Sequence, residues 1–222
     1  NIAKYENSNL PTGLWLSELT HFYDSAQKQN YNISIASAKG GKTPIDPESL
    51  KPFMLDSISK KYWADSSFKE MLQQTLSFDD VANQMYNCVY LTGGHGTMYD
   101  FPNNETLQSI IKNHYENNKI VSAVCHGVGS LLNVKLSNGN YLIKDKTITG
   151  FNWFEESLAR RKKDVPFNLE ASLKERGSHY KKALIPMTSH VEIDGNLITG
   201  QNPFSSKEIA EAVMKKLRKT FI

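Results

Sequence analysis

Three apolar segments of this chain run directly into tight turns, and each has the length and composition of a buried strand. The segments cover residues 87–92, 119–124 and 146–149, and the turns that end them begin at Gly93, Cys125 and Gly150. Strands that alternate with helices form a mostly parallel sheet with helices on both faces, an α/β fold. Because the carboxyl ends of parallel strands meet at one edge, we expect the three turns to face one cleft.

Apolar residues recur with helical spacing in several other stretches and alternate like strands in others. We expect helices over 13–29, 104–117, 125–133, 153–162, 166–176 and 206–219, and further strands over 31–37, 191–194 and 196–199. Asp194-Gly195 predicts a hairpin, and Ser205 with Glu208 predicts a capping box for the last helix. Residues 39–47 predict a loop, and residues 48–84 a small insertion with short helices near 66–75 and 79–84.

The composition limits the class of protein. The 222 residues, with 39% apolar and 22% charged side chains, fit one globular domain over 1–222. No apolar run is long enough to cross a membrane. The net charge of +3 is too small to indicate a nucleic-acid partner, and we interpret the basic clusters at 160–163 and 215–219 as solvated surface. Two cysteines outside any C-x-x-C motif, and no visible signal peptide, favour a reducing compartment, hence the cytoplasm.

Cys125 is the strongest candidate for chemistry. An apolar strand delivers it into a helix with Gly127 two residues later, which is the pattern of a nucleophile elbow. A helix N-terminus favours the thiolate, the reactive form of cysteine. The sequence around Cys125 fits a buried, inert cysteine equally well. Cys88, in the middle of an apolar strand, predicts inert core.

His126 follows Cys125, and an imidazole that serves as a base needs a carboxylate to orient it. Glu155 and Glu156 lie just beyond the third turn. Asn152 can cap a helix there, which places Glu155 at the N3 position with a structural role. Glu156 is therefore the better candidate to orient His126, with Glu155 as the alternative.

Glu18 lies on the flank of the apolar stripe of the first predicted helix, between the buried and the solvated faces. Such a carboxyl group is either a boundary residue or an acid whose pKa is raised by burial and by a nearby thiolate. In the second case it would donate to the thiolate and move protons.

Gly93-Gly94-His95-Gly96 lacks the lysine and the spacing of a phosphate-binding loop. Its glycines let backbone N–H groups approach a ligand closely, which suits an oxyanion hole, although an ordinary turn would also use them. The six histidines show no metal-ligand spacing, and the E-x-x-H of Glu18 and His21 occurs once, so we predict no metal site and no cofactor. His190 and Glu192 form an H-x-E, which we interpret as part of a strand.

Several motifs together resemble the ThiJ/PfpI superfamily, and within it the branch of glyoxalase III and heat-shock chaperones. They occur in order along nearly the whole chain: Thr12-Gly13-Leu14-Trp15-Leu16-Ser17-Glu18, Ala38-Lys39-Gly40-Gly41, Pro44-Ile45-Asp46-Pro47, Gly93-Gly94-His95-Gly96-Thr97-Met98, Ala123-Val124-Cys125-His126-Gly127, Thr149-Gly150-Phe151 and Ile198-Thr199-Gly200-Gln201-Asn202-Pro203. The resemblance implies a flavodoxin-like three-layer sandwich. Val128 departs from the family pattern, which commonly has proline after Cys-His-Gly.

The resemblance also implies roles for individual residues. Cys125 matches the family nucleophile and His126 its partner, Glu18 the carboxyl group that contacts the thiol, and Glu156 the acidic third member, while Gly93 and Gly94 match the oxyanion-binding turn. Relatives in this branch convert methylglyoxal to lactate without glutathione, so we expect a small reactive aldehyde as substrate.

The resemblance leaves other functions open. Cys125 could be oxidised in a redox-responsive stress protein or holdase chaperone, and an apolar patch in the insertion would favour that function. An amidase, peptidase or protein deglycase is a second alternative. A homodimer is the expected assembly. The family usually opens with a strand before the first helix, and we expect that strand upstream of Asn1.

Overall fold

A four-stranded sheet forms the centre of the computed structural model, which describes residues 1–220. Its order is β4 (Cys88–Leu91), β5 (Ile120–Val124), β9 (Leu197–Gly200) and β8 (Val191–Asp194). The first three strands are parallel, and β8 pairs with β9 in the predicted hairpin. All five residues of β5 are buried, as expected for a strand covered on both faces.

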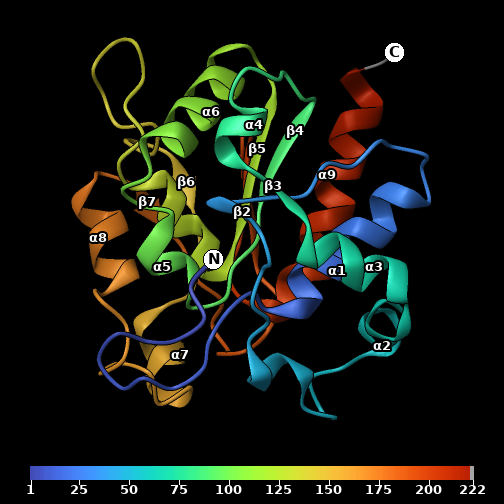
Figure 1. The fold of residues 1–222 in the computed structure, drawn as a ribbon. Helices are drawn as coiled ribbons and strands as arrows, with labels where there is room; N and C mark the ends of the chain where they lie inside the picture. The colour runs from blue at the N-terminus through green and yellow to red at the C-terminus, as the bar shows by residue number, and fades with distance from the viewer. Residues whose placement is uncertain (221–222) are drawn as a thin grey trace.

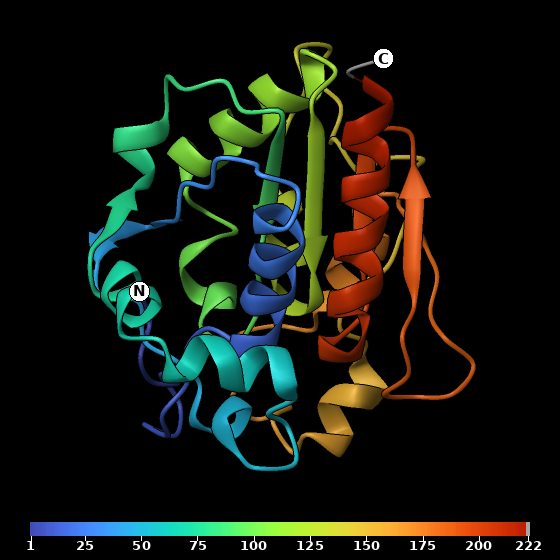
Figure 2. The ribbon, with the colours of Figure 1, turned by 90° about the vertical axis from the view of Figure 1, so that its right-hand side faces the viewer.

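Helices cover both faces of this sheet, which confirms the predicted three-layer α/β sandwich. On one face, α1 (Leu16–Gln27) and α9 (Ser206–Thr220) pack side by side (Figures 1 and 2). On the other face lie α5 (Thr97–Asp100), α6 (Glu105–Glu116) and α8 (Leu169–Glu175) (Figure 1). The amphipathic stripe of α6 explains its place, because Leu107, Ile110 and Ile111 are all buried.

The strand predicted over 31–37 is wrong over most of its length. Only β1 (Ala36–Ser37) forms, in a separate sheet of order β1-β3-β2 with β3 (Thr75–Ser77) and β2 (Lys39–Gly41). β2 forms within the segment that was predicted to be a loop. It forms there because β3 of the insertion provides an antiparallel partner. The strand expected over 146–149 does not join the main sheet. It forms β6 (Thr147–Ile148), which pairs instead with β7 (His179–Tyr180), a two-residue strand that the sequence pattern did not indicate.

The insertion contains more helix than expected. It consists of η1 (Pro47–Leu50), α2 (Ser57–Ala64), α3 (Ser66–Gln73) and α4 (Phe78–Val81). Asp56 caps α2, which the sequence analysis missed, by accepting from the backbone N–H of Ser59. The helices bury Tyr62, Phe68 and Leu72 against α1 in a second small core. Helices α2 and α3 of the insertion therefore extend the sandwich at its lower right in Figure 1.

Several predicted helix ends differ from the observed ends. α7 (Trp153–Leu158) is shorter than predicted because Arg160 takes a left-handed conformation, and α8 begins only after its cap, Asn168. The segment after β5 is the 3₁₀ helix η2 (Cys125–Leu131). The predicted capping box of α9 is wrong. Ser205 is the last residue of a preceding 3₁₀ turn, η3 (Pro203–Ser205), and its hydroxyl donates to the carbonyl of His190. The Glu208 carboxylate accepts from the hydroxyl of Ser189 instead.

Candidate active site

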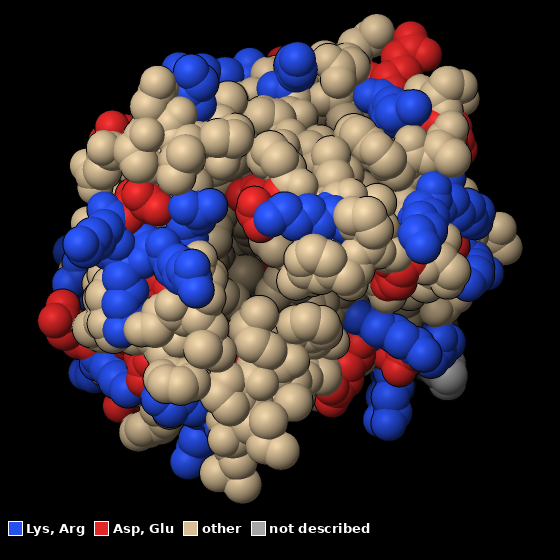
Figure 3. Space-filling view, turned by 90° about the horizontal axis from the view of Figure 1, so that it is seen from below, with Lys and Arg blue, Asp and Glu red and all other residues tan. Residues whose placement is uncertain are grey.

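The turns after β4, β5 and β6 meet at the carboxyl edge of the main sheet, the lower end of the molecule in Figure 1. The backbone N–H of Phe151 donates to the carbonyl of Cys125 at 3.4 Å, which joins the third turn to the second. A Cβ atom placed on Gly93 would lie 2.9 Å from Cβ of Cys125, so the first two turns are in direct contact. Seen from this end, the molecular surface is hollowed near its centre (Figure 3).

Cys125 sits at the tip of a strained turn. Its φ angle of 57° lies in the left-handed region that residues with a side chain rarely adopt, as at other nucleophile elbows. The thiol is buried, and its Sγ lies 3.2 Å from Nδ1 of His126. Burial, together with the neighbouring Glu18 carboxyl group, raises the pKa of the Cys125 thiol. The thiol therefore needs a base beside it to form the thiolate.

His126 connects Cys125 to Glu156. Its Nε2 lies 2.8 Å from Oε2 of Glu156, and a carboxylate can only accept there, so Nε2 carries the proton. Nδ1 then has a free lone pair toward the thiol. Burial lowers the pKa of His126 to about 4, which keeps the imidazole neutral at pH 7.

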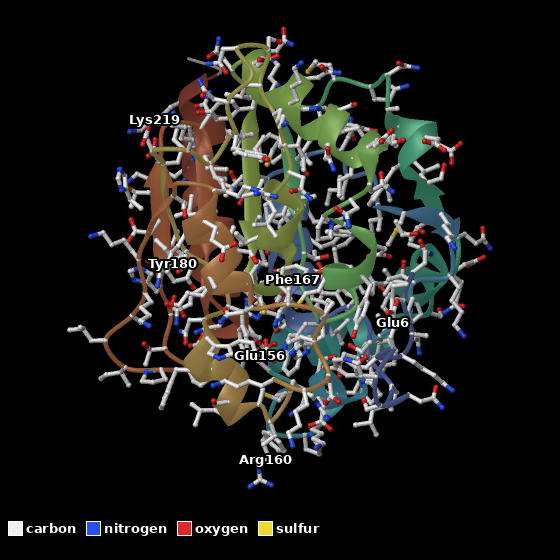
Figure 4. All side chains as sticks on the ribbon, turned by 90° about the vertical axis from the view of Figure 1, so that its left-hand side faces the viewer. Glu6, Glu156, Arg160, Phe167, Tyr180 and Lys219 are labelled. Carbon is white, nitrogen blue, oxygen red and sulfur yellow. The ribbon has the colours of Figure 1, made fainter. Side chains whose placement is uncertain are left out.

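Glu156 is a buried carboxylate at the inner side of α7, whereas Arg160 beyond the end of that helix points away into solvent (Figure 4). Burial alone would raise the pKa of Glu156. Its interactions with His126 and His95 outweigh burial and hold the pKa below its usual range. Glu156 is thus ionised at neutral pH.

Glu155 points away from His126 and ties α7 to two loops. Its Oε1 accepts from the backbone N–H of Met187 and from the side-chain amides of Gln201 and Asn202, at 2.7–2.8 Å. Asn152 caps α7 as predicted, by accepting from the N–H of Glu155. The two neighbouring glutamates therefore occupy different environments, and only Glu156 contacts His126.

We expect variants of these two residues to differ in kind. Glu155→Ala removes the oxygen that accepts from three N–H donors, so it should lower the free energy of unfolding by about 2–4 kcal/mol. Glu156→Gln should leave stability within about 1 kcal/mol and instead reduce the reactivity of Cys125. Urea unfolding and the rate of Cys125 alkylation measure the two effects. Equal stability of the two variants would contradict this assignment.

Glu18 lies on α1 and is fully buried, although the sequence placed it on the flank of the apolar stripe. Its Oε2 accepts from the backbone N–H of Gly93 at 2.6 Å, and its carboxyl group interacts with the Cys125 thiol. Burial raises the pKa of Glu18 to about 8, so the carboxyl group holds a proton at neutral pH. A protonated Glu18 can donate to sulfur from its other oxygen, Oε1, which has no other hydrogen-bond partner in the described chain.

The two glycines of the first turn differ in what their N–H groups do. The N–H of Gly93 donates to Glu18 in this structure, and the oxyanion-binding role expected for the two glycines stays a prediction. Gly94 has a φ angle of 100°, and a Cβ atom there would lie 2.1 Å from the carbonyl oxygen of Gly13. Only glycine fits this position, and its N–H group remains as the candidate donor.

Gly93→Ala should damage both stability and reactivity. The added methyl group would lie 2.6 Å from Oε2 of Glu18 and 2.8 Å from the carbonyl of Val124, so the turn must shift away from Cys125. We expect a loss of about 1–3 kcal/mol in the free energy of unfolding. Gly129→Ala is the matched control, because its new methyl group meets only side-chain atoms at 3.6 Å and beyond. Similar losses in both variants would refute the close approach at Gly93.

His95 also belongs to this site, although the sequence did not indicate it. Its Nε2 lies 2.9 Å from Oε1 of Glu156, and its ring lies 4.0 Å from that of His126. The nitrogens and carboxylate oxygens of His95, His126 and Glu156 come within 4.8 Å of one another, close enough to surround a metal ion, which the spacing of the histidines did not predict. Hydrogen bonds account for the cluster, because the carboxylate accepts one N–H from each imidazole. The one sequence signal for His95 was its place directly after the two glycines.

The other candidate motifs do not join this site. His21 pairs with Asp56, and His190 lies 3.0 Å from Glu192 on β8, so neither histidine serves Cys125. Cys88 lies in β4, where burial raises the pKa of its thiol.

A cavity of about 530 Å³ lies apart from Cys125, His126, Glu18 and Glu156, none of which lines it. It separates β4, an edge strand of the main sheet, from residues 31–35, and its lining includes Leu19, Phe22, Ile33, Ile35, Cys88 and Tyr90. The strand expected before the first helix stays a prediction.

Within residues 1–220, no helix is both long and apolar enough to span a membrane.

The fold and the site define a doubly wound α/β protein with a cysteine–histidine–glutamate chain at the carboxyl edge of its sheet. Residues 13–216 match the model of the DJ-1/PfpI family, and the chain belongs to that family.

The chain is similar to several known proteins. It is 29% identical to the glutathione-independent glyoxalase hsp3101 of Schizosaccharomyces pombe, over 94% of this chain and 90% of the relative. It is 30% identical to glyoxalase 3 of Candida albicans, over 91% and 89% of the two chains. The crystal structure of the glyoxalase III from Candida albicans superposes with a TM-score of 0.86, and covers 97% of this chain and 92% of that one at 30% identity. The Rapid Encystment Protein 24 kDa of Francisella tularensis superposes with a TM-score of 0.92 at 42% identity, over 97% and 95%.

Proposed function

We propose that this protein is a glutathione-independent glyoxalase that converts methylglyoxal to lactate by means of the Cys125 thiolate. The names of the relatives support an enzyme of this type. One observation carries the proposal for this chain: the buried thiol lies between a neutral imidazole that can take its proton and a protonated carboxyl group that can give one. This arrangement suits addition of a thiol to an aldehyde followed by proton transfer between adjacent carbons.

The first step is formation of a hemithioacetal. His126 takes the thiol proton at Nδ1, and Sγ attacks the aldehyde carbon, whose oxygen receives a proton from Glu18. Glu156 stabilises the imidazolium that forms, since it already accepts from Nε2. The N–H of Gly94 is a candidate to stabilise the developing oxyanion.

The second step moves hydrogen from one carbon to the next. Ionised Glu18 removes the proton of the former aldehyde carbon, and His126 protonates the ketone oxygen, which gives an enediol. Glu18 then protonates the second carbon, while His126 takes the proton of the hydroxyl group on the sulfur-bearing carbon, which leaves a thioester of lactic acid. One carbon is oxidised and the other reduced, so no external oxidant is needed.

Hydrolysis completes the cycle. Water adds to the thioester and gives one proton to Glu18, and the thiolate leaves and takes its proton back from His126. The net reaction adds one water to methylglyoxal. Lactate formation from methylglyoxal in the absence of glutathione tests the proposal, and a purified, folded protein that forms no lactate would refute it.

A redox-responsive function is the second candidate. The observation that favours it is the protonated Glu18 beside Cys125, because the same donor would stabilise a cysteine oxidised by peroxide to the sulfinate. Phe53, Met71 and Leu76 of the insertion are exposed, which bears on the holdase alternative. Intact mass after peroxide treatment, and suppression of client aggregation by wild type and Cys125→Ala, separate these functions from the glyoxalase.

We also propose that the active protein is a homodimer that acts on a small aldehyde. Sedimentation equilibrium measures the assembly.

A further inference from the structure

Glu156 accepts hydrogen bonds from two imidazoles, and only one of them belongs to the proposed proton relay. His126 donates to Oε2 at 2.8 Å, and His95 donates to Oε1 at 2.9 Å. All three residues are at least nine-tenths buried, so no bulk water competes for these oxygens. The two contacts fix both oxygens of the carboxylate.

His95 is itself firmly held. It follows Gly94 in the turn after β4, and its ring packs against those of Tyr5, His126 and Phe151 at centroid distances of 5.4, 4.0 and 6.1 Å. Its Nδ1 is buried and has no hydrogen-bond partner in the described chain, so the contact with Glu156 is its one polar anchor there. A carboxylate partner requires the proton on Nε2.

We propose that His95 is a positioning residue for the Cys125 reaction. By occupying Oε1 it holds the Glu156 carboxylate in the rotation that directs Oε2 at Nε2 of His126. This contact in turn keeps the proton of His126 on Nε2 and the lone pair on Nδ1, beside the thiol. His95 therefore acts on Cys125 through two intervening groups, Glu156 and His126.

The alternative is that His95 only fills space between aromatic rings. Two substitutions separate these roles. His95→Phe preserves the ring packing but removes the N–H donor, whereas His95→Gln loses the ring but can place an amide N–H near the position of Nε2. A positioning residue predicts damage in the first variant and rescue in the second, while a packing residue predicts the reverse.

The experiment measures kcat and KM for methylglyoxal, and separately the rate of Cys125 alkylation by iodoacetamide at pH 7, in a Cys88→Ala background. We expect His95→Phe to lower both kcat and the alkylation rate about 10–100-fold with little change in KM, and His95→Gln to recover most of the loss. Circular dichroism and the urea midpoint show that each variant is folded.

A double-mutant cycle adds a second test. In a Glu156→Gln background the relay is already broken. If His95 acts only through Glu156, His95→Phe should lower the alkylation rate by less than about 2-fold in this background. Wild-type rates in His95→Phe, or equal losses in both backgrounds, would overturn the inference.

The expected loss in kcat rests on the proposed glyoxalase function, whereas the expected loss in the alkylation rate does not. If the wild type forms no lactate and His95→Phe still slows alkylation, the glyoxalase proposal fails while the role of His95 stands.

Discussion

Cys125→Ala should abolish lactate formation, with a loss of about 10⁴-fold or more in kcat/KM. The reaction requires a covalent bond between sulfur and the aldehyde carbon, and no other described side chain at the site can form a comparable bond. The free energy of unfolding should change little, because alanine removes only the sulfur and keeps the left-handed backbone of the turn. Lactate assay and urea unfolding on the same preparations measure both quantities.

Cys88→Ala is the matched control for this variant. Cys88 is the only other cysteine of the chain, it lies on β4, and it is not part of the site. Its substitution should leave the lactate rate within about 2-fold of wild type. Lactate production by Cys125→Ala at a substantial fraction of the wild-type rate would disprove covalent catalysis by this residue.

Glu18→Gln has the second largest expected effect, a fall of about 10²–10⁴-fold in kcat. The amide can still accept from the N–H of Gly93 through its carbonyl oxygen, so the geometry of the turn is preserved. It cannot lose and regain a proton, so the transfer between the two carbons should fail. Formation of the hemithioacetal should be less affected, and Cys125 should still react with iodoacetamide.

The same variant should change how stability depends on pH. Burial raises the pKa of Glu18 to about 8 from an ordinary value of 4.5. Between these values the folded protein holds a proton that the unfolded chain releases, so wild type loses stability as pH rises from about 5 to 8. Glutamine has no such loss. The stability of Glu18→Gln relative to wild type should therefore increase over this window.

Urea unfolding at pH 5.5 and at pH 8.5 measures this difference. A constant gap between the two proteins would mean that Glu18 is not protonated in the folded state. Ser17→Ala, which alters a buried polar neighbour that does not titrate, is the control. Its effect on stability should not depend on pH.

The sequence predicted the parts of the fold that depend on strong local patterns. The strands 88–91, 120–124 and 197–200 and the helix 105–116 carry continuous or regular apolar spacing, and they form where expected. Residues 31–35 alternate as clearly but pair with no strand, because pairing depends on a partner that local sequence does not contain. The same reason explains β2, which forms only because β3 lies beside it.

For the site, sequence alone determined Cys125 with its neighbour His126, since a strand that ends in Cys-His-Gly places both at one turn. It also favoured Glu156 over Glu155, by counting from the Asn152 cap. Only the tertiary structure decided the contacts between distant segments. Gly93 and Glu18 are 75 residues apart, and His95 and Glu156 are 61 apart. Burial at those contacts raises the pKa of Glu18, and the two imidazoles keep Glu156 ionised. The sequence thus named the nucleophile, whereas packing set the protonation states that its chemistry requires.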